Sequence, residues 1–291
     1  MIFKPILLSD EAKISLYLSQ SPSGQLIDCF EAFYLWRDAL GVQWAEVEGF
    51  ALFRVHYRAG EPQYLFPFGA GDPAPVIERL RRDCARQGIP LRLAKVRQEQ
   101  LLYLQERFPG AFTATGHRDH AEYLFETARF HTYSGKALQP KRNLVNYARK
   151  AFDWHYEPVA PANLAECCAF ANRFSGDESF AADSEALSEA LTHFEALPAM
   201  SGGVIRIAGA IAALFICTGL GDGQTAAGLF LRGDHDKRGV IPLLYQLYFI
   251  DHPEFRYFNF GEDLGLDGLR QNKLSFQPSE LLELYEVEEI Q

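Results

Sequence analysis

The sequence predicts an α+β protein built from two copies of one unit, and three observations support this prediction. The chain has 291 residues, about twice the ~150 residues of a common domain. Hydrophobic residues make up 48% and charged residues 23%, which is typical of a packed globular protein and excludes a disordered chain. The expected elements also follow one order in both halves: a three-strand meander, a helix, a strand, a helix and a strand. We therefore expect tandem duplicated units, each with a mixed, mostly antiparallel sheet and flanking helices.

The N-terminal copy is expected to begin with a helical arm, Asp28–Leu40. Its strands are short apolar runs separated by turn residues, and its first long helix ends at Gly88, which suits the left-handed conformation after a helix C-terminus. The expected elements, in order, are strands Trp44–Val47, Phe50–Tyr57 and Tyr64–Phe68, helix Pro73–Gln87, strand Leu91–Val96, helix Arg97–Arg107 and strand Ala121–Glu126.

The C-terminal copy repeats this order after two further helices. Its crossover helix has apolar residues at helical spacing, with Pro242 in the first turn, where proline is tolerated. The expected elements are helices Ala162–Arg173 and Ser184–Phe194, strands Val204–Ile207, Ala210–Cys217 and Ala226–Arg232, helix Gly239–Asp251, strand Arg256–Phe260, helix Leu264–Lys273 and strand Leu281–Val287. We thus predict domains at residues 1–135 and 153–291, joined by a connecting helix at 136–152.

The connecting helix is basic although the chain is acidic. With 28 Lys and Arg against 38 Asp and Glu, the net charge is −10, which excludes a nucleic-acid binder that is basic throughout but allows a local basic patch. Lys136–Lys150 holds five basic residues and no acid. Lys141 and Arg142 fall in the first helical turn, where the helix dipole disfavours cations, and this cost suggests an anionic partner. The alternative is pairing with acids of the C-terminal tail: Glu280, Glu283, Glu286, Glu288 and Glu289.

Other features predict a cytoplasmic protein without a resident metal. The five cysteines are odd in number and lack zinc-type spacing, so reduced thiols are expected. The N-terminus has no signal-peptide pattern, and the charge-free stretch Ile207–Gly221 is too short to span a bilayer. His117-Arg-Asp-His120 offers two imidazoles without a third ligand and is interpreted as a surface loop.

The order of elements in each copy resembles the GNAT acyltransferase unit, in which an antiparallel meander precedes a crossover helix and a parallel strand. That resemblance implies a sheet that splits between its central strands, with an acyl donor near the N-terminus of the crossover helix. Arg238 and Gly239 lie at the start of that helix here and are the candidate residues for binding a coenzyme A donor, together with Lys237 and the backbone N–H groups of Gly239 and Val240. A solvated loop of mixed charge is the alternative.

Two motifs resemble a more specific family. The first is Tyr123-Leu-Phe, followed by Tyr133-Ser-Gly-Lys and Pro140-Lys-Arg-Asn143. The second is the run from Tyr257 to Pro278, which contains Gly-Glu-Asp-Leu-Gly-Leu-Asp-Gly-Leu-Arg-Gln-Asn-Lys. Both are similar to the uncharacterised bacterial proteins that resemble the C-terminal catalytic domain of phosphatidylglycerol lysyltransferase.

The resemblance implies a tandem GNAT fold that transfers an aminoacyl or acyl group to an amine or hydroxyl acceptor in an interdomain cleft. It implies an aminoacyl-tRNA or acyl-CoA donor, no other required cofactor, and a small-molecule or lipid acceptor. The matching positions are Asn259, Glu262, Asp263, Arg270 and Lys273, faced by Lys141, Arg142 and Asn143, with Tyr133 and Arg232 as further substrate-binding candidates.

Elementary chemistry assigns roles to these residues. Acyl transfer to an amine needs cations or N–H donors for the tetrahedral oxyanion and a group that takes the amine proton. Lys273 and Arg270, at i and i+3 of one helix, are expected to bind the oxyanion or a phosphate, and Asp263 or Glu262 to accept the proton. A salt-bridged cap on a short helix is the alternative for this cluster.

The chain departs from the family pattern at three polar positions. Phe260 and Gly261 replace an Arg-Glu pair, and Leu231 lies where the family has glutamate. Three functions therefore stay open: an aminoacyltransferase, a coenzyme A-dependent GNAT N-acyltransferase, and a relative that binds a ligand without catalysis. Charged-tRNA-dependent transfer, protection by coenzyme A, and binding without turnover would distinguish them.

Overall fold

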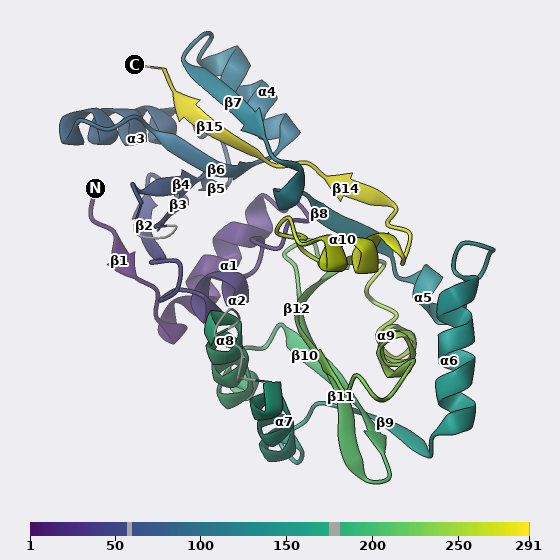
Figure 1. Ribbon diagram of the computed structural model, residues 1–291. Coiled ribbons are helices and arrows are strands. Elements are labelled where there is room, and N and C mark those ends of the chain that lie inside the picture. The colour runs from purple at the N-terminus through teal and green to yellow at the C-terminus, as the bar shows by residue number, and fades with distance from the viewer. Residues whose placement is uncertain (57–59, 175–180, 291) are drawn as a thin grey trace. The chain divides into compact units, whose positions relative to one another are not determined.

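A computed structural model describes residues 1–56, 60–174 and 181–290 (Figure 1). Tyr57, the predicted end of one strand, lies outside these residues. Contacts divide the chain into two compact units. Unit 1 comprises Met1–Glu122, Glu262–Leu266 and Leu281–Gln291, and unit 2 comprises Tyr123–Gly261 and Asp267–Glu280. The predicted α+β class is confirmed, because each unit contains a mixed sheet with flanking helices.

Unit 1 contains an eight-stranded sheet in its described residues, in the order β1-β2-β3-β4-β6-β15-β7 with β5 paired to β3. The strands run antiparallel except for the parallel pair β4–β6. Their bounds are β1 Lys4–Pro5, β2 Gln43–Val47, β3 Phe50–Val55, β4 Gln63–Leu65, β5 Phe68–Gly69, β6 Arg92–Val96, β7 Phe112–Gly116 and β15 Tyr285–Glu289.

The helices of unit 1 cover this sheet with apolar faces. Helix α3, for example, buries Val76, Ile77, Leu80 and Cys84 in the core that also contains Leu93 of β6, as helical spacing predicts. It ends at Gly88, whose φ of 75° confirms the predicted C-terminal glycine. The helices are η1 Leu8–Asp10, α1 Glu11–Gln20, α2 Phe30–Leu35, α3 Ala74–Gln87, α4 Gln98–Arg107 and η3 Arg118–His120.

Unit 2 is built around a seven-stranded sheet, counted over the described part of the chain, in the order β14-β8-β13-β12-β11-β10-β9. Its strands are β8 Glu122–Glu126, β9 Trp154–Pro158, β10 Met200–Ile207, β11 Ala210–Gly219, β12 Thr225–Gly233, β13 Tyr257–Asn259 and β14 Glu280–Leu282. Its helices are α5 Ala128–Thr132, α6 Gln139–Ala151, α7 Leu164–Ala171, η4 Asn172–Phe174, α8 Ala181–Thr192, η6 Phe194–Ala196, α9 Val240–Asp251 and α10 Asp267–Leu274.

Two strands lie in the sheet of the other half of the chain. Strand β8 comes from the N-terminal half but pairs with β13 in unit 2, and β15 comes from the C-terminal end but lies between β6 and β7 in unit 1. The predicted strand Leu281–Val287 is therefore two strands, β14 and β15, in different sheets. Alternation of apolar residues predicts that a strand forms but not which strand it pairs with. The predicted superposition of residues 1–135 on 153–291 stays a prediction.

The sheet of unit 2 opens between two of its central strands. β12 and β13 run parallel and pair only from Thr225–Tyr257 to Ala227–Asn259. Strand β12 has nine residues and continues to Gly233, whereas β13 ends at Asn259. The second half of β12 thus diverges from the chain that follows Asn259. This is the split that a GNAT-like sheet is expected to have.

Candidate functional site

Asn259 closes β13 at the point where the sheet opens. Its side chain is fully buried, and its Oδ1 accepts a hydrogen bond of 2.8 Å from the N–H of Gly261. Gly261 has φ of 67°, in the left-handed region that favours glycine. The Gly261 departure from the family pattern therefore has a local structural reason: it forms the turn that Asn259 stabilises.

Lys273 lies on α10 with only 4% of its surface exposed. Its Nζ donates to the C=O of Phe260 at 2.5 Å and lies 5.0 Å from the Phe260 ring centroid and 5.6 Å from that of Tyr123. Arg270 precedes it by three residues on the same helix, as predicted. The helix begins at Asp267 rather than at Leu264, because Leu264 and Gly265 both have positive φ and break the helical conformation.

The two predicted acids belong to unit 1 and are both ion-paired there. Glu262 contacts Lys95 Nζ, and both side chains are about 15% exposed. Asp263 is fully buried, lies 3.2 Å from Arg118 Nη1, and its Oδ1 accepts the N–H of Gly265 at 3.0 Å. Both acids thus form ion pairs, as the alternative of a salt-bridged cap on a short helix expects.

Lys95 and Arg118 are partners that the sequence did not indicate. Lys95 has φ of 54° in β6, near the register shift between β6 and β15, and Gln25 Nε2 donates to its C=O at 3.1 Å. A positive φ in a strand is strained for a lysine, and such strain often occurs at functional sites. Both partners lie more than a hundred residues from the acids they contact, so no local motif could reveal them.

Lys141 and Arg142 differ in their surroundings although they are adjacent. Lys141 Nζ lies 3.6 Å from the ring centroid of Phe276, two residues after the end of α10, and burial lowers the pKa of its ammonium to about 8. Arg142 Nη1 instead donates to the C=O of Tyr133 at 2.5 Å and to that of Gly135 at 3.4 Å. Arg142 therefore holds the end of α5, whereas Lys141 lies on an aromatic ring.

Three of the tail acids that the alternative pairs with this helix have basic partners within unit 1. Glu286 lies 3.9 Å from His117, and Glu288 and Glu289 pair with Arg92 at 3.1 Å and Arg81 at 2.8 Å. All of these contacts lie within unit 1. These three acids are thus engaged by their own unit.

Tyr133 and Arg232 are engaged within unit 2. Tyr133 is the left-handed residue after α5, and its buried phenol donates to the C=O of Pro242 at 2.7 Å. Arg232 pairs with Asp183 on α8 and donates to its own neighbour's C=O at 3.0 Å. Asn143, by contrast, is exposed on α6.

The start of α9 is covered by α6. Gly239 has φ of 86°, and a Cβ atom there would overlap the C=O oxygen of Leu144. The N–H of Val240, predicted as an anion donor, already donates to the C=O of Lys237 at 3.2 Å. The side chain of Arg238 lies over the ring of Tyr147, 5.7 Å from its centroid. The expected phosphate site at this helix end is therefore partly filled by the chain itself.

An aromatic cluster lies behind the sheet opening in unit 2. The ring of Tyr245 on α9 lies 5.6 Å from that of Phe260 and 5.8 Å from that of Phe276. Its hydroxyl is buried and has no hydrogen-bond partner among the residues that the structure describes. Phe260, which replaces the arginine of the family pattern, thus adds its ring to this cluster, and its backbone C=O accepts the hydrogen bond from Lys273.

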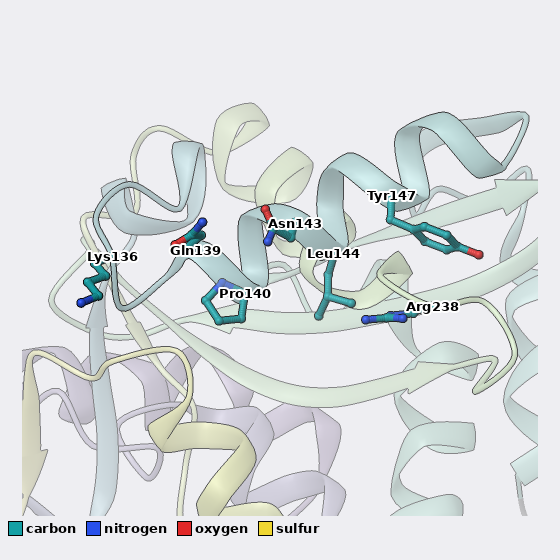
Figure 2. Close-up of a pocket in the computed structure, with 7 residues that line it drawn as sticks. All are labelled: Lys136, Gln139, Pro140, Asn143, Leu144, Tyr147 and Arg238. Carbon is teal, nitrogen blue, oxygen red and sulfur yellow. The ribbon is translucent and has the colours of Figure 1, made fainter.

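A surface hollow of about 510 Å³ runs along α6. Figure 2 shows its lining, in which Tyr147 and Arg238 lie toward one end and Lys136 toward the other. Within residues 1–56, 60–174 and 181–290, no group of three His, Cys, Asp or Glu side chains is arranged to hold a metal ion. Over the same ranges, no helix has both the length and the apolar character needed to cross a membrane.

Comparison with known proteins gives a family and several similar structures. A conserved protein of unknown function from Bacteroides thetaiotaomicron VPI-5482 is 27% identical, with a TM-score of 0.92 over 100% of both chains. The structure of L-PGS from Bacillus licheniformis has a TM-score of 0.67 and 15% identity over 96% of this chain and 91% of that one. A tandem GNAT protein from the clavulanic acid biosynthesis pathway has a TM-score of 0.51 and 10% identity over 99% and 98%.

These similarities confirm the GNAT-like fold. No curated protein sequence matches the chain. The sequence profile of the family described as "Phosphatidylglycerol lysyltransferase, C-terminal" matches residues 21–288, which confirms the resemblance carried by the two motifs. The chain belongs to this family.

Proposed function

We propose that this protein is an aminoacyltransferase that moves an aminoacyl group from a charged tRNA to an amine or hydroxyl acceptor. The observation that carries the proposal is the opening of the unit 2 sheet between β12 and β13, with buried Asn259 and Lys273 at its closed end. In a GNAT-like fold this opening is where donor and acceptor meet. The family and the L-PGS structure support the aminoacyl donor.

Lys273 and Arg270 are the residues that we assign to the developing negative charge. Attack by the acceptor nitrogen or oxygen on the ester carbonyl forms a tetrahedral oxyanion, which preorganised cations stabilise. The C–O bond to the ribose then breaks, and the leaving oxygen takes up a proton. Lys273 is suited to this role because its Nζ is held by the Phe260 C=O at 2.5 Å and is therefore fixed before the substrate binds.

Glu262 is the carboxylate that we assign as acceptor of the amine or hydroxyl proton. It follows Asn259 by three residues in the chain and keeps 15% of its side chain exposed, whereas Asp263 is fully buried. Asp263, held by Arg118 and the Gly265 N–H, then shapes the turn that carries Glu262. Lys95 contacts Glu262 and holds its side chain in place.

A transfer assay with two variants tests the proposal. The purified protein is incubated with tRNA charged with radiolabelled amino acids and, in separate arms, with small amines or with vesicles containing lipid head groups that bear amines or hydroxyls. Removing one oxyanion donor typically lowers turnover by about 10²–10³, so Lys273→Gln should show this loss. Exposed Lys150 gives a matched control, because Lys150→Gln removes the same charge from unit 2 and should retain full turnover.

Each result decides between the candidate functions. Full activity of folded Lys273→Gln would overturn the assignment of Lys273. Transfer with acetyl-CoA but not with any charged tRNA would favour the coenzyme A-dependent alternative, for which Arg238 at the start of α9 is the supporting residue. Saturable ligand binding without transfer from either donor would identify a binding relative without catalysis.

A further inference from the structure

The α6 hollow is the space lined by Lys136, Gln139, Pro140, Asn143, Leu144, Tyr147 and Arg238 (Figure 2). Its volume of about 510 Å³ lies within the range of small-ligand sites. The lining combines two cations, two amides and one aromatic ring, and it includes no acid. In a chain of net charge −10, this combination is a local site for an anion.

The two cations of the hollow form no ion pair with an acidic side chain in the part of the chain that the structure describes. Over the part of the chain that the structure describes, neither Lys136 nor Arg238 has an ion pair, whereas Arg232, also on unit 2, pairs with Asp183. Both Lys136 and Arg238 are exposed. Their N–H groups can therefore donate to a ligand without first breaking an internal salt bridge.

The position of Arg238 relative to α6 is fixed by the backbone. Gly239 packs so closely on the Leu144 C=O that no side chain fits there, and α6 and α9 pack together along unit 2 (Figure 1). The loop that carries Arg238 is therefore held on the surface of α6. A site whose charged groups are held in place loses less conformational entropy when a ligand binds.

Tyr147 supplies a flat surface inside the same hollow. Its side chain is 49% exposed, with Phe152 packed edge-on at 6.2 Å and 88°. An aromatic ring beside cations is the combination that binds a single-stranded polynucleotide, whose bases stack while its phosphates pair. A membrane surface would require several exposed apolar side chains beside the cations, and on α6 Tyr147 is the only large exposed one.

We infer that the α6 hollow binds a nucleotide of single-stranded RNA, with phosphates at Lys136 and Arg238 and a base on Tyr147. Asn143 and Gln139 offer amide groups to the edge of the base or to the ribose. The inference rests on the proposed function in one respect: RNA is the carrier of the aminoacyl donor. It places the carrier on exposed side chains of α6 and on Arg238, rather than on the backbone N–H groups of Gly239 and Val240, where the chain itself fills the space.

Fluorescence anisotropy with a labelled eight-nucleotide RNA that carries no amino acid tests the inference on the full-length protein. Lys136→Gln and Arg238→Gln should each weaken binding at 0.1 M salt about fivefold and each reduce the slope of log K against log salt by about 0.7. Tyr147→Leu should weaken binding about tenfold and leave the slope unchanged, and Tyr147→Phe should bind normally. Arg86→Gln, which removes an exposed charge from unit 1, should bind like the wild type.

Two results would overturn the inference. One is unchanged RNA affinity in all three hollow variants, with melting temperatures that show folded protein. The other is binding to anionic vesicles that the same variants abolish while RNA binding is absent, which would assign the hollow to a membrane. The RNA probe carries no amino acid, so this binding assay does not depend on aminoacyl transfer. Normal RNA binding by a protein that shows no aminoacyl transfer would refute the proposed function alone. Aminoacyl transfer that the hollow variants leave unchanged would refute this inference alone.

Discussion

The charged side chains of the two units are stabilised in different ways. In unit 1 the cations near the candidate acids form ion pairs: Lys95 with Glu262, and Arg118 with Asp263. In unit 2 three cations near α6 lie over aromatic rings instead: Lys141 over Phe276, Lys237 over Phe152, and Arg238 over Tyr147. A ring attracts a cation through its face but accepts few hydrogen bonds. The cations that lie over rings in unit 2 therefore keep N–H donors for a ligand, whereas the ion pairs of unit 1 stabilise the fold.

The largest effect is expected where a pair of unit 1 is broken. Lys95→Met leaves the Glu262 carboxylate without its cation in a site that is about 85% buried, and we expect unfolding to become easier by about 2–3 kcal/mol. Urea denaturation measures this change. The double variant Lys95→Met with Glu262→Gln should recover most of the loss. A loss below ~0.5 kcal/mol would show that the pair contributes no more than a surface salt bridge.

A smaller effect should separate the neighbours Lys141 and Arg142. Arg142→Gln removes a charge-assisted donor from the C=O groups of Tyr133 and Gly135, and we expect a loss of about 1–2 kcal/mol. Lys141→Met keeps the contact with Phe276 and removes a cation from the first helical turn, so stability should change little or rise. Equal losses in both variants, measured by chemical denaturation, would contradict the contrast between them.

Removing the buried hydroxyl of Tyr245 should raise the free energy of unfolding by about 1 kcal/mol. Its hydroxyl has no partner in the described part of the chain, and an unsatisfied buried hydroxyl is destabilising. Tyr245→Phe should therefore raise the melting temperature of the protein. A lower melting temperature would mean that the hydroxyl has a partner, and reduced transfer in a stabilised variant would indicate that this partner is the substrate.

The smallest effect is a pH dependence that belongs to Lys141, whose side chain is only partly buried, so that solvent screens much of the effect. Its pKa in the folded protein is about 8, below the ordinary 10.5, so the unfolded chain binds more protons between these values. Stability from this group therefore rises as the pH increases from 8 to 10. Between pH 8 and pH 10, the melting temperature of the wild type should rise relative to that of Lys141→Met. A constant difference between the two would contradict the buried position of the ammonium.

Local sequence signals predicted much of the secondary structure but few of the strand pairings and side-chain contacts at the site. Gly88 marked a helix end correctly because C-terminal capping depends on neighbouring residues alone. The exchange of β8 and β15 could not be predicted, since strand pairing depends on distant chain. The sequence also gave no sign of the left-handed conformation of Lys95, which is disfavoured for lysine and depends on the surrounding sheet.

The sequence predicted which residues are functional candidates, but it did not predict the atoms that their side chains contact. Lys273 and Arg270 lie on one helix as their spacing required. Arg142 and Tyr133 were expected to bind substrate, yet their polar atoms contact backbone C=O groups within unit 2. Tyr147 was not singled out, because a tyrosine on a helix is more often part of a core than of a ligand site. Only its exposure and the neighbouring Arg238 distinguish it.

The position of β15 has a consequence for how the molecule is made. β15 lies between β6 and β7, yet the chain reaches it only after passing through all of unit 2. During synthesis, β6 and β7 would therefore wait with open edges until residues 285–289 leave the ribosome. Contacts of such sequence separation slow folding, and open edges are sites of aggregation. The N-terminal unit should be the last to complete its sheet, although it is the first to be translated.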